Sequence, residues 1–202
     1  MSKKISRRDF IKTTAAAGGA AALMPQTIFS SQNKKNMRIG FIGTGLRGQW
    51  MLWLATKYPD VEIPAICDID DGMISAALKI IKDSGRKEPK VYKKNDEDFR
   101  NLVKDEELDG VYIATPWKWH HPMAIAAMKA GIHVGTEVPA ALTVNECWDL
   151  VNVSEKTGKF CMIMENVCYR RDVMAVLNMV RRNMFGELLH CQGGYQHDLR
   201  HV

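Results

Sequence analysis

The most constraining stretch of this chain is an apolar segment that runs into three closely spaced glycines. Residues 38–48 read R-I-G-F-I-G-T-G-L-R-G, with glycines at Gly43, Gly45 and Gly48. A strand followed by glycines at this spacing permits a tight turn, a close approach of the backbone to a pyrophosphate, and close packing of the next helix. The helix expected to begin near Leu46 would offer its free N–H groups to the phosphates. The sequence therefore predicts a dinucleotide-binding loop.

An acidic residue supports this prediction and indicates which dinucleotide is bound. A second strand is expected over 61–66, and Asp68 follows it, twenty residues past Gly48. A carboxylate at this distance accepts hydrogen bonds from the adenosine ribose. No Arg or Lys follows closely, and Asp70 and Asp71 add negative charge that would repel the extra phosphate of NADP. The pattern favours NAD over the alternative of a plain glycine turn beside a surface aspartate.

The first thirty-one residues are expected to lie outside the fold. Residues 6–12 read S-R-R-D-F-I-K, a twin-arginine export signature, and an apolar run over 13–24 follows. That run is too short to span a bilayer, which needs about 20 residues. We therefore predict an export signal over 1–31, a periplasmic location and no membrane span. The alternative is a basic N-terminus with an accidental arginine pair.

The basic balance of the chain comes mostly from this segment. Residues 1–31 contain five basic side chains and one acidic one, a net charge of +4 out of +5 for the whole chain. The remainder is close to neutral and lacks the clustered basic face that nucleic-acid binding needs. We expect no nucleic-acid partner.

Cysteine and histidine usage does not predict a metal site. The five cysteines, an odd number without C-x-x-C spacing, are Cys67, Cys147, Cys161, Cys168 and Cys191. We expect most of them to be small buried hydrophobic residues. His190 and His197 are seven apart on an expected strand and would point to opposite faces, so together with His201 and Asp198 they do not predict a zinc site.

Downstream of residue 37, strand and helix patterns alternate with short polar connections. This alternation predicts an α/β fold, a Rossmann doubly wound parallel sheet over 37–165. Strands are expected at 38–42, 61–67, near Val91, 109–114, 132–136 and 160–165. Helices are expected at 46–57, 71–84, 95–104, 121–130, 143–157 and 171–183. Asp70 and Asp96 are expected to start helices, and Gly131 and Gly158 to end them.

The last part of the chain, 166–202, differs from the part before it. The expected helix at 171–183 carries a predicted core stripe of Val173, Val176, Leu177 and Val180. A long polar strand expected from Glu187 to about Tyr195 would open a second, largely antiparallel sheet. This segment therefore predicts the start of an α+β domain that is truncated at its C-terminus, since a strand without a partner exposes an unpaired edge.

Polar and aromatic residues follow three further strands, at the edge where a doubly wound sheet binds its ligand. The strand at 109–114 is followed by T-P-W-K-W-H, whose Trp117, Trp119 and His120 either contact the dinucleotide or pack as an ordinary helix start. Glu137 follows the next strand, as a ribose or nicotinamide contact or as a solvated charge. Asn166 could reach a cofactor amide or hydroxyl. Tyr195 is placed to touch a substrate.

These motifs together resemble those of a known superfamily. R-I-G-F-I-G-T-G, Asp68, T-P-W-K-W-H, E-V-P and E-N-V-C-Y-R-R-D are similar to the glucose-fructose oxidoreductase and inositol dehydrogenase superfamily. The common form of the third motif is Glu-Lys-Pro, and here Val138 replaces its lysine, which commonly assists proton transfer from a sugar hydroxyl. A narrower resemblance accounts for this change: residues 165–180 and 185–200 look like glycoside hydrolase family 109, the NAD-dependent α-N-acetylgalactosaminidases.

The resemblance implies both a reaction and a set of contacts. It implies a glycosidase in which bound NAD takes hydride from C3 of the sugar, the glycosidic group is eliminated, water adds, and the hydride returns. Its substrate would be a small molecule or glycan with terminal α-N-acetylgalactosamine, and a homo-oligomer stays open. Besides the glycine loop, the implied cofactor contacts are Leu46, Arg47, Asp68, Trp117, Lys118, Trp119, His120, Glu137, Val138 and Asn166, and Tyr195 contacts the substrate.

Two alternatives stay open beside the glycosidase. One is an NAD-dependent sugar dehydrogenase of the wider superfamily, against which Val138 argues. The other is a fragment that holds NAD without chemistry. The resemblance implies that the acid and base residues lie beyond Val202, so we expect the chain by itself to be inactive.

Overall fold

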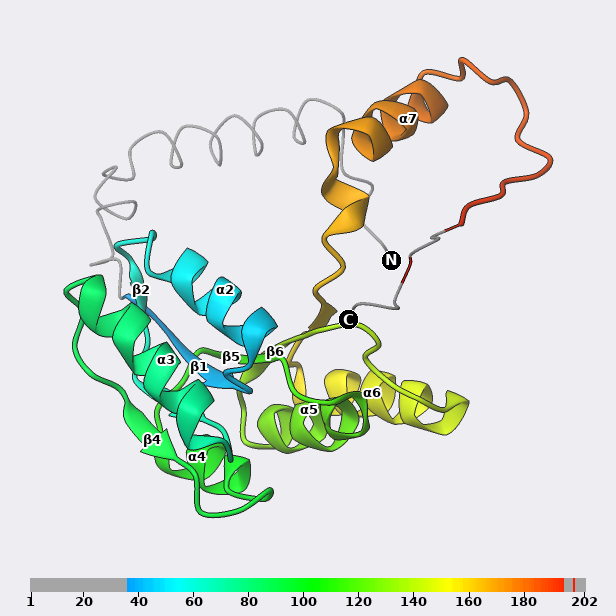
Figure 1. Ribbon diagram of the computed structural model, residues 1–202. Coiled ribbons are helices and arrows are strands. Elements are labelled where there is room, and N and C mark those ends of the chain that lie inside the picture. The colour runs from blue at the N-terminus through cyan, green and yellow to red at the C-terminus, as the bar shows by residue number, and fades with distance from the viewer. Residues whose placement is uncertain (1–35, 195–197, 199–202) are drawn as a thin grey trace, which may run out of the picture.

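A parallel sheet with helices on both faces forms the body of the molecule. The computed structural model describes residues 36–194 and 198 (Figure 1). Among them, seven strands form one sheet in the order β4-β3-β1-β5-β6-β7, with β2 paired to β1, and every pairing is parallel. The strands are β1 (Met37–Ile42), β2 (Val61–Glu62), β3 (Ala65–Cys67), β4 (Lys90–Tyr92), β5 (Gly110–Ile113), β6 (His133–Thr136) and β7 (Cys161–Ile163).

Helices connect the strands. They are α2 (Leu46–Ala55), α3 (Asp71–Asp83), α4 (Phe99–Asp105), α5 (His120–Lys129), α6 (Val144–Thr157) and α7 (Arg171–Arg181), with 3-10 turns η2 (Trp117–Trp119) and η3 (Val167–Tyr169). From β1 the chain winds outward through β3 and β4, then returns to β5 on the other side and winds through β6 and β7. The predicted doubly wound Rossmann sheet is confirmed. The order in which the chain adds strands reverses between β1 and β5, and doubly wound sheets bind their ligands at this point.

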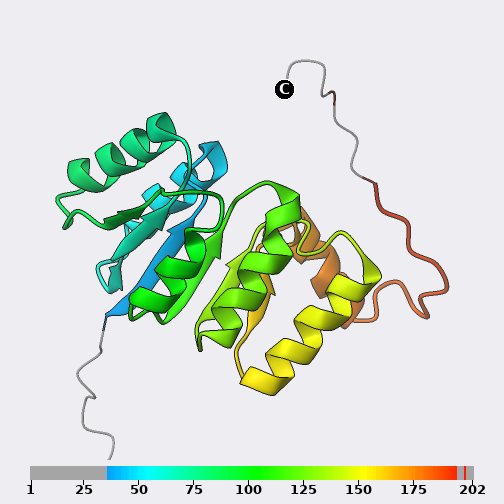
Figure 2. The ribbon, with the colours of Figure 1, turned by 90° about the horizontal axis from the view of Figure 1, so that it is seen from below.

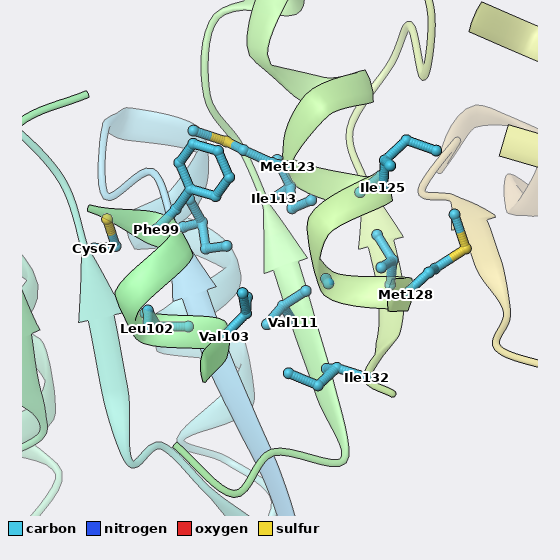
Figure 3. Packing of buried hydrophobic residues seen from close by; sticks show 14 of the residues in the cluster. Cys67, Phe99, Leu102, Val103, Val111, Ile113, Met123, Ile125, Met128 and Ile132 are labelled. Carbon is cyan, nitrogen blue, oxygen red and sulfur yellow. The ribbon is translucent and has the colours of Figure 1, made fainter. Parts of the chain in front are cut away.

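Two hydrophobic cores lie on the two faces of the sheet. Phe99, Leu102 and Met128 belong to the core beneath α4, α5 and α6, and Figure 3 shows the side chains of α4 and α5 meeting over β5. Figure 2 shows α5 and α6 lying side by side. The opposite core places Leu52 of α2 and Ile81 of α3 against the sheet. Burial on both faces explains why the strands read as continuous apolar runs.

Side chains and glycines define several helix ends. Asp70 caps α3 by accepting a hydrogen bond from the N–H of Met73 at 2.9 Å, as predicted. Thr143 and Glu146 form a reciprocal capping box at the start of α6, and Gly158 ends that helix with φ 67°. A residue in the left-handed region costs least when it is glycine.

Two predicted boundaries were wrong for identifiable reasons. The single strand expected over 61–67 is divided into β2 and β3 at Pro64, which has no N–H to give to a ladder. The helix expected to start at Asp96 begins at Phe99 instead. Asp98 holds the preceding residues in a turn, because its carboxylate accepts hydrogen bonds from the N–H of Lys94 at 2.8 Å and from Asn101 at 2.7 Å.

Two expectations for the C-terminal segment, a core stripe and a long strand, were also wrong within the described residues. The stripe of α7 is exposed rather than part of a core, with exposed fractions from 37% for Leu177 to 52% for Val176. Figure 1 shows α7 standing away from the sheet. Residues 187–194 form no strand. An amphipathic helix buries its stripe only where a partner surface meets it, and no such surface lies against α7 in the described part of the chain.

Candidate functional site

The three glycines of the loop after β1 differ in their surroundings. Gly43 has φ +90°, and a Cβ there would lie 2.5 Å from the carbonyl oxygen of Ala114. A Cβ on Gly48 would lie 2.1 Å from the carbonyl oxygen of Gly43, whereas one on Gly45 would meet nothing within 4 Å. The first glycine therefore makes the turn, the third packs α2 onto the loop, and the second leaves backbone open to a ligand. This is the division of roles that a pyrophosphate site requires.

The open glycine borders a cavity at the carboxyl ends of β1, β3 and β5. The cavity has a volume of about 270 Å³. Its lining residues are Ile42, Gly43, Gly45, Cys67, Asp68, Ile69, Met73, Asn95, Asp96, Ala114, Thr115, Pro116, Trp119 and Met123. Among these described residues there is no Lys or Arg, while two are aspartates. The lining fits NAD and disfavours the extra phosphate of NADP.

Asp68 is held firmly at the edge of this cavity. Its Oδ2 accepts hydrogen bonds from the N–H and the hydroxyl of Thr44, at 2.5 and 2.9 Å. Its Oδ1 accepts from the N–H groups of Ile69 and Asp70, at 2.7 and 3.0 Å. These bonds orient the carboxylate beside the glycine loop. A ribose hydroxyl arriving there would share or replace some of them, since a carboxylate has about four acceptor positions.

A second polar group joins α2 to the end of β6. Arg47 donates from Nε to Oε1 of Glu137 at 2.6 Å, and its guanidinium lies 5.2 Å from the ring centroid of Trp50. The hydroxyl of Tyr112, in β5, donates to the same Glu137 oxygen. Partial burial lowers the pKa of Arg47, but the hydrogen bond and charge of Glu137 outweigh this and raise it overall. The structure thus brings together two of the predicted cofactor contacts.

The T-P-W-K-W-H segment divides into residues with different environments. Trp119 lines the cavity and packs edge-on against Phe99, with 6.1 Å between centroids. Trp117 is exposed, and Lys118 lies over the Trp119 ring at 5.6 Å. His120 is 1% exposed, and its Nδ1 and Nε2 each lie 2.7 Å from a backbone oxygen, of Pro139 and Thr115 respectively. Both ring nitrogens of His120 are used within the protein, so the ring ties the loop after β5 to the loop after β6.

The other predicted site residues lie outside the cavity lining. Leu46 is exposed beside the glycine loop, and Asn166 is exposed at the start of η3. Val138 forms a cis peptide bond with Pro139 and borders a separate apolar groove between α6 and β7. Tyr195, His197 and His201 lie outside the described residues.

Some lining residues were missed by sequence reasoning. Asn95 and Asp96 follow β4 and face the cavity, so the rule that placed Asp68 at a strand's carboxyl end would have found them. Thr44 and Tyr112, which hydrogen-bond to Asp68 and Glu137 without lining the cavity, gave a weaker signal in the sequence. A threonine between glycines and a tyrosine within an apolar strand are not distinctive until their partners are known.

The cysteines differ from expectation. All five are free thiols, but only Cys67 is buried, while Cys147, Cys168 and Cys191 are exposed. Burial raises the pKa of the Cys67 thiol to about 12, with help from the nearby carboxylates of Asp98 and Asp68. The expectation that most are buried was wrong, because three lie on outer helix faces or in the C-terminal segment. No group of three or more metal-ligating side chains occurs among residues 36–194.

Comparison with known families agrees with this geometry. Residues 37–165 match the oxidoreductase family with an NAD-binding Rossmann fold, and residues 169–202 match the C-terminal domain of glycosyl hydrolase 109. Residues 4–24 match a twin-arginine translocation signal, so the chain carries the predicted export signal. Across residues 36–194, no helix has the length and apolar character needed to cross a membrane.

Curated relatives are similar in sequence to almost the whole of this chain. A glycosyl hydrolase family 109 protein of Parabacteroides distasonis is 51% identical over 98% of this chain and 46% of its own length. An alpha-N-acetylgalactosaminidase of Tannerella forsythia is 50% identical, again over 98% of this chain and 46% of its own. The chain therefore spans about half the length of the curated relatives it matches.

Solved structures agree on the fold. An NAD-binding protein from Listeria innocua is 27% identical with a TM-score of 0.62, over 76% of this chain and 42% of its own. A scyllo-inositol dehydrogenase from Lactobacillus casei, solved with NAD(H) and scyllo-inositol, is 21% identical with a TM-score of 0.66. The match covers 76% of this chain and 43% of the dehydrogenase chain.

Fold and site define an NAD-binding Rossmann domain of the oxidoreductase type. Within that class, the chain belongs to the oxidoreductase family with an NAD-binding Rossmann fold, and it is similar to glycosyl hydrolase family 109 proteins over almost its whole length. The predicted resemblance and the predicted cofactor, NAD, are confirmed.

Proposed function

We propose that this chain is the NAD-binding part of a glycosidase that acts on terminal α-N-acetylgalactosamine. The observation that carries the proposal is the open glycine loop beside Asp68, in a chain 50% identical to an alpha-N-acetylgalactosaminidase. When bound, NAD supplies a hydride acceptor that can return the hydride, so that a sugar is oxidised only transiently. The residues of this chain hold and orient the cofactor.

We assign the contacts of the adenosine and pyrophosphate half first. The backbone around Gly45, with Leu46 and Arg47, receives the pyrophosphate at the start of α2, where free N–H groups favour anions. Asp68 accepts hydrogen bonds from the adenosine ribose. Trp119 offers an apolar wall, and Trp117, Lys118 and His120 belong to the same loop.

The far half of the cofactor extends toward β6 and β7. Glu137 is the polar group at the end of β6, and Val138 and Asn166 follow β6 and β7. Tyr195, later in the chain, is proposed to contact the sugar. The acid and base groups are proposed to come from the part of the relatives that this chain does not match, so the chain alone binds NAD without cleaving substrate. The protein is proposed to be released into the periplasm after export.

A sugar dehydrogenase is the second candidate, favoured by the superfamily and the fold. The residue at position 138 separates the two candidates. The superfamily resemblance implies a lysine there that commonly assists proton transfer from a sugar hydroxyl, and the Val138 of this chain has no proton to transfer. We therefore place the glycosidase first.

One experiment distinguishes the candidates. The chain is joined to the C-terminal half of the Tannerella forsythia relative and incubated with NAD and an aryl α-N-acetylgalactosaminide, and aglycone release and NADH absorbance are followed together. Aglycone release without net NADH supports the glycosidase. Steady accumulation of NADH without release would support the dehydrogenase and overturn the proposal. The chain alone is the control, expected to do neither.

A further inference from the structure

Tyr112 is a buried tyrosine whose hydroxyl reaches a proposed cofactor contact. It lies in β5 and is 5% exposed, and its hydroxyl donates a hydrogen bond to Oε1 of Glu137. Its ring packs against Phe41 of β1, with 5.6 Å between ring centroids. The ring is therefore fixed by the sheet, and its hydroxyl occupies a defined position near the carboxyl edge.

Glu137 is held from three directions. Its N–H donates to the carbonyl of Ile113 at 2.9 Å, which fixes its backbone at the end of β5. Its Oε1 receives both the Tyr112 hydroxyl and Nε of Arg47. Charge-assisted hydrogen bonds of this kind are stronger than neutral ones. Burial, reinforced by the Glu137 carboxylate, raises the pKa of Tyr112, so its phenol keeps its proton and stays a donor across the physiological range.

This arrangement leaves the second oxygen of the carboxylate available. Within the part of the chain that the structure describes, both side-chain donors reach Oε1 and none reaches Oε2. No fully buried side-chain oxygen or nitrogen among those residues lacks a partner, so Oε2 keeps some contact with solvent, on a side chain that is 16% exposed. An ionised carboxylate only accepts hydrogen bonds. Oε2 is thus an oriented acceptor at the end of β6.

The position of Glu137 indicates which half of the dinucleotide it meets. Asp68, after β3, lies on one side of the reversal point between β1 and β5, and Glu137 lies on the other. A dinucleotide with its adenosine ribose at Asp68 and its pyrophosphate at Gly45 places its nicotinamide half over the ends of β5 and β6. That half carries hydroxyl and amide donors, which suit Oε2.

We propose that Tyr112 is a positioning residue that holds Glu137 so that Oε2 accepts a hydrogen bond from the nicotinamide half of NAD. This inference rests on the proposed function only in its assignment of Glu137 to the cofactor. Tyr112 itself touches no part of NAD. It acts by fixing the rotamer of Glu137 jointly with Arg47.

The test compares NAD with ADP, which lacks the nicotinamide and its ribose. Titration calorimetry on Tyr112→Phe is expected to show NAD affinity weakened by about tenfold, the usual scale of one hydrogen bond to a charged group, with ADP affinity unchanged. Tyr92→Phe is the matched control. Tyr92 is also 5% exposed and donates to a glutamate, Glu106, at 2.7 Å, yet neither residue lines the cofactor cavity.

The outcomes separate the inference from the proposed function. Equal loss of NAD and ADP affinity, or no loss of either, would overturn the positioning role. An effect of the same size in Tyr92→Phe would also overturn it. If the unaltered chain bound no NAD, both proposals would fall. Should Tyr112→Phe fail to fold, Glu137→Gln, which keeps the side-chain shape, must show the same selective loss of NAD affinity for the inference to stand.

Discussion

At the scale of single residues, Asp68 combines a structural and a binding role. Its carboxylate accepts four hydrogen bonds from Thr44, Ile69 and Asp70. Replacement by alanine is expected to weaken NAD binding by about 1 to 3 kcal/mol, because a charged acceptor for the ribose is lost. Calorimetry would measure the affinity, and Asp68→Asn, which keeps the shape, would separate the charge from the loop contacts. Unchanged NAD affinity in Asp68→Ala would remove this residue from the site.

The glycines permit a sharper pair of substitutions. Gly48→Ala is expected to destabilise the fold by about 1 to 3 kcal/mol or more, since the new methyl would lie 2.1 Å from a backbone oxygen that cannot move cheaply. Gly45→Ala places its methyl in open space and is expected to cost about 1 kcal/mol or less, as an N-cap change. It should nevertheless weaken NAD binding at least about tenfold, because the methyl occupies the approach of the pyrophosphate.

Denaturant unfolding and NAD titration of both glycine variants would check this pair of predictions. If Gly45→Ala bound NAD normally, the pyrophosphate would lie elsewhere. If Gly48→Ala were as stable as the parent chain, the close approach of α2 to the loop would be refuted.

At the scale of elements, the start of α4 is expected to contribute to the stability of the fold in a pH-dependent way. Asp98 is 6% exposed, and hydrogen bonds from the N–H of Lys94 and from Asn101 lower its pKa despite its burial. A carboxylate whose pKa is lower in the folded state stabilises that state at pH values above its unfolded pKa of about 3.9. This stabilisation is lost as the pH falls through the pKa of the folded state. Asp98→Asn is expected to be less stable at pH 7 by about 1 to 2 kcal/mol.

The free energy of unfolding measured between about pH 7 and pH 2 would check this prediction. The variant should lose less stability than the parent chain as the pH falls, since it has no carboxylate to protonate there. Equal slopes for the two proteins would contradict it. Asp105→Asn, in the same helix, is the control and should follow the parent chain.

Element order and type could be predicted from sequence because local signals determine them. The glycine loop, the cap at Asp70 and the left-handed Gly158 all act within a few residues. Boundaries that depend on side-chain contacts at a distance were missed, as at Asp98. The same division holds for the site. Asp68 follows from spacing, whereas the bond from Tyr112 to Glu137 joins residues 25 apart, which no local pattern reveals.

At the scale of the whole molecule, the described residues form a parallel sheet with helices on both faces, followed by an amphipathic helix that has no packing partner among them. The stripe of α7 and the groove of about 570 Å³ between α6 and β7 both expose hydrophobic side chains. The sequence predicted burial of that stripe because helical spacing identifies an apolar face. Spacing alone does not tell whether the surface that covers this face is present.

Exposed apolar residues of α7 and buried apolar residues of α6 are expected to differ measurably in their contribution to the free energy of unfolding. Leu177→Glu on α7 is expected to change the free energy of unfolding by less than about 0.5 kcal/mol, since Leu177 is 37% exposed and packs on no core cluster. Leu150→Ala on α6 is expected to cost about 2 to 5 kcal/mol, because Leu150 is 8% exposed within the core. Urea unfolding of both variants checks this. A loss in Leu177→Glu comparable with that in Leu150→Ala would mean that α7 packs onto the sheet in solution, and its stripe would then belong to the core that its spacing predicted.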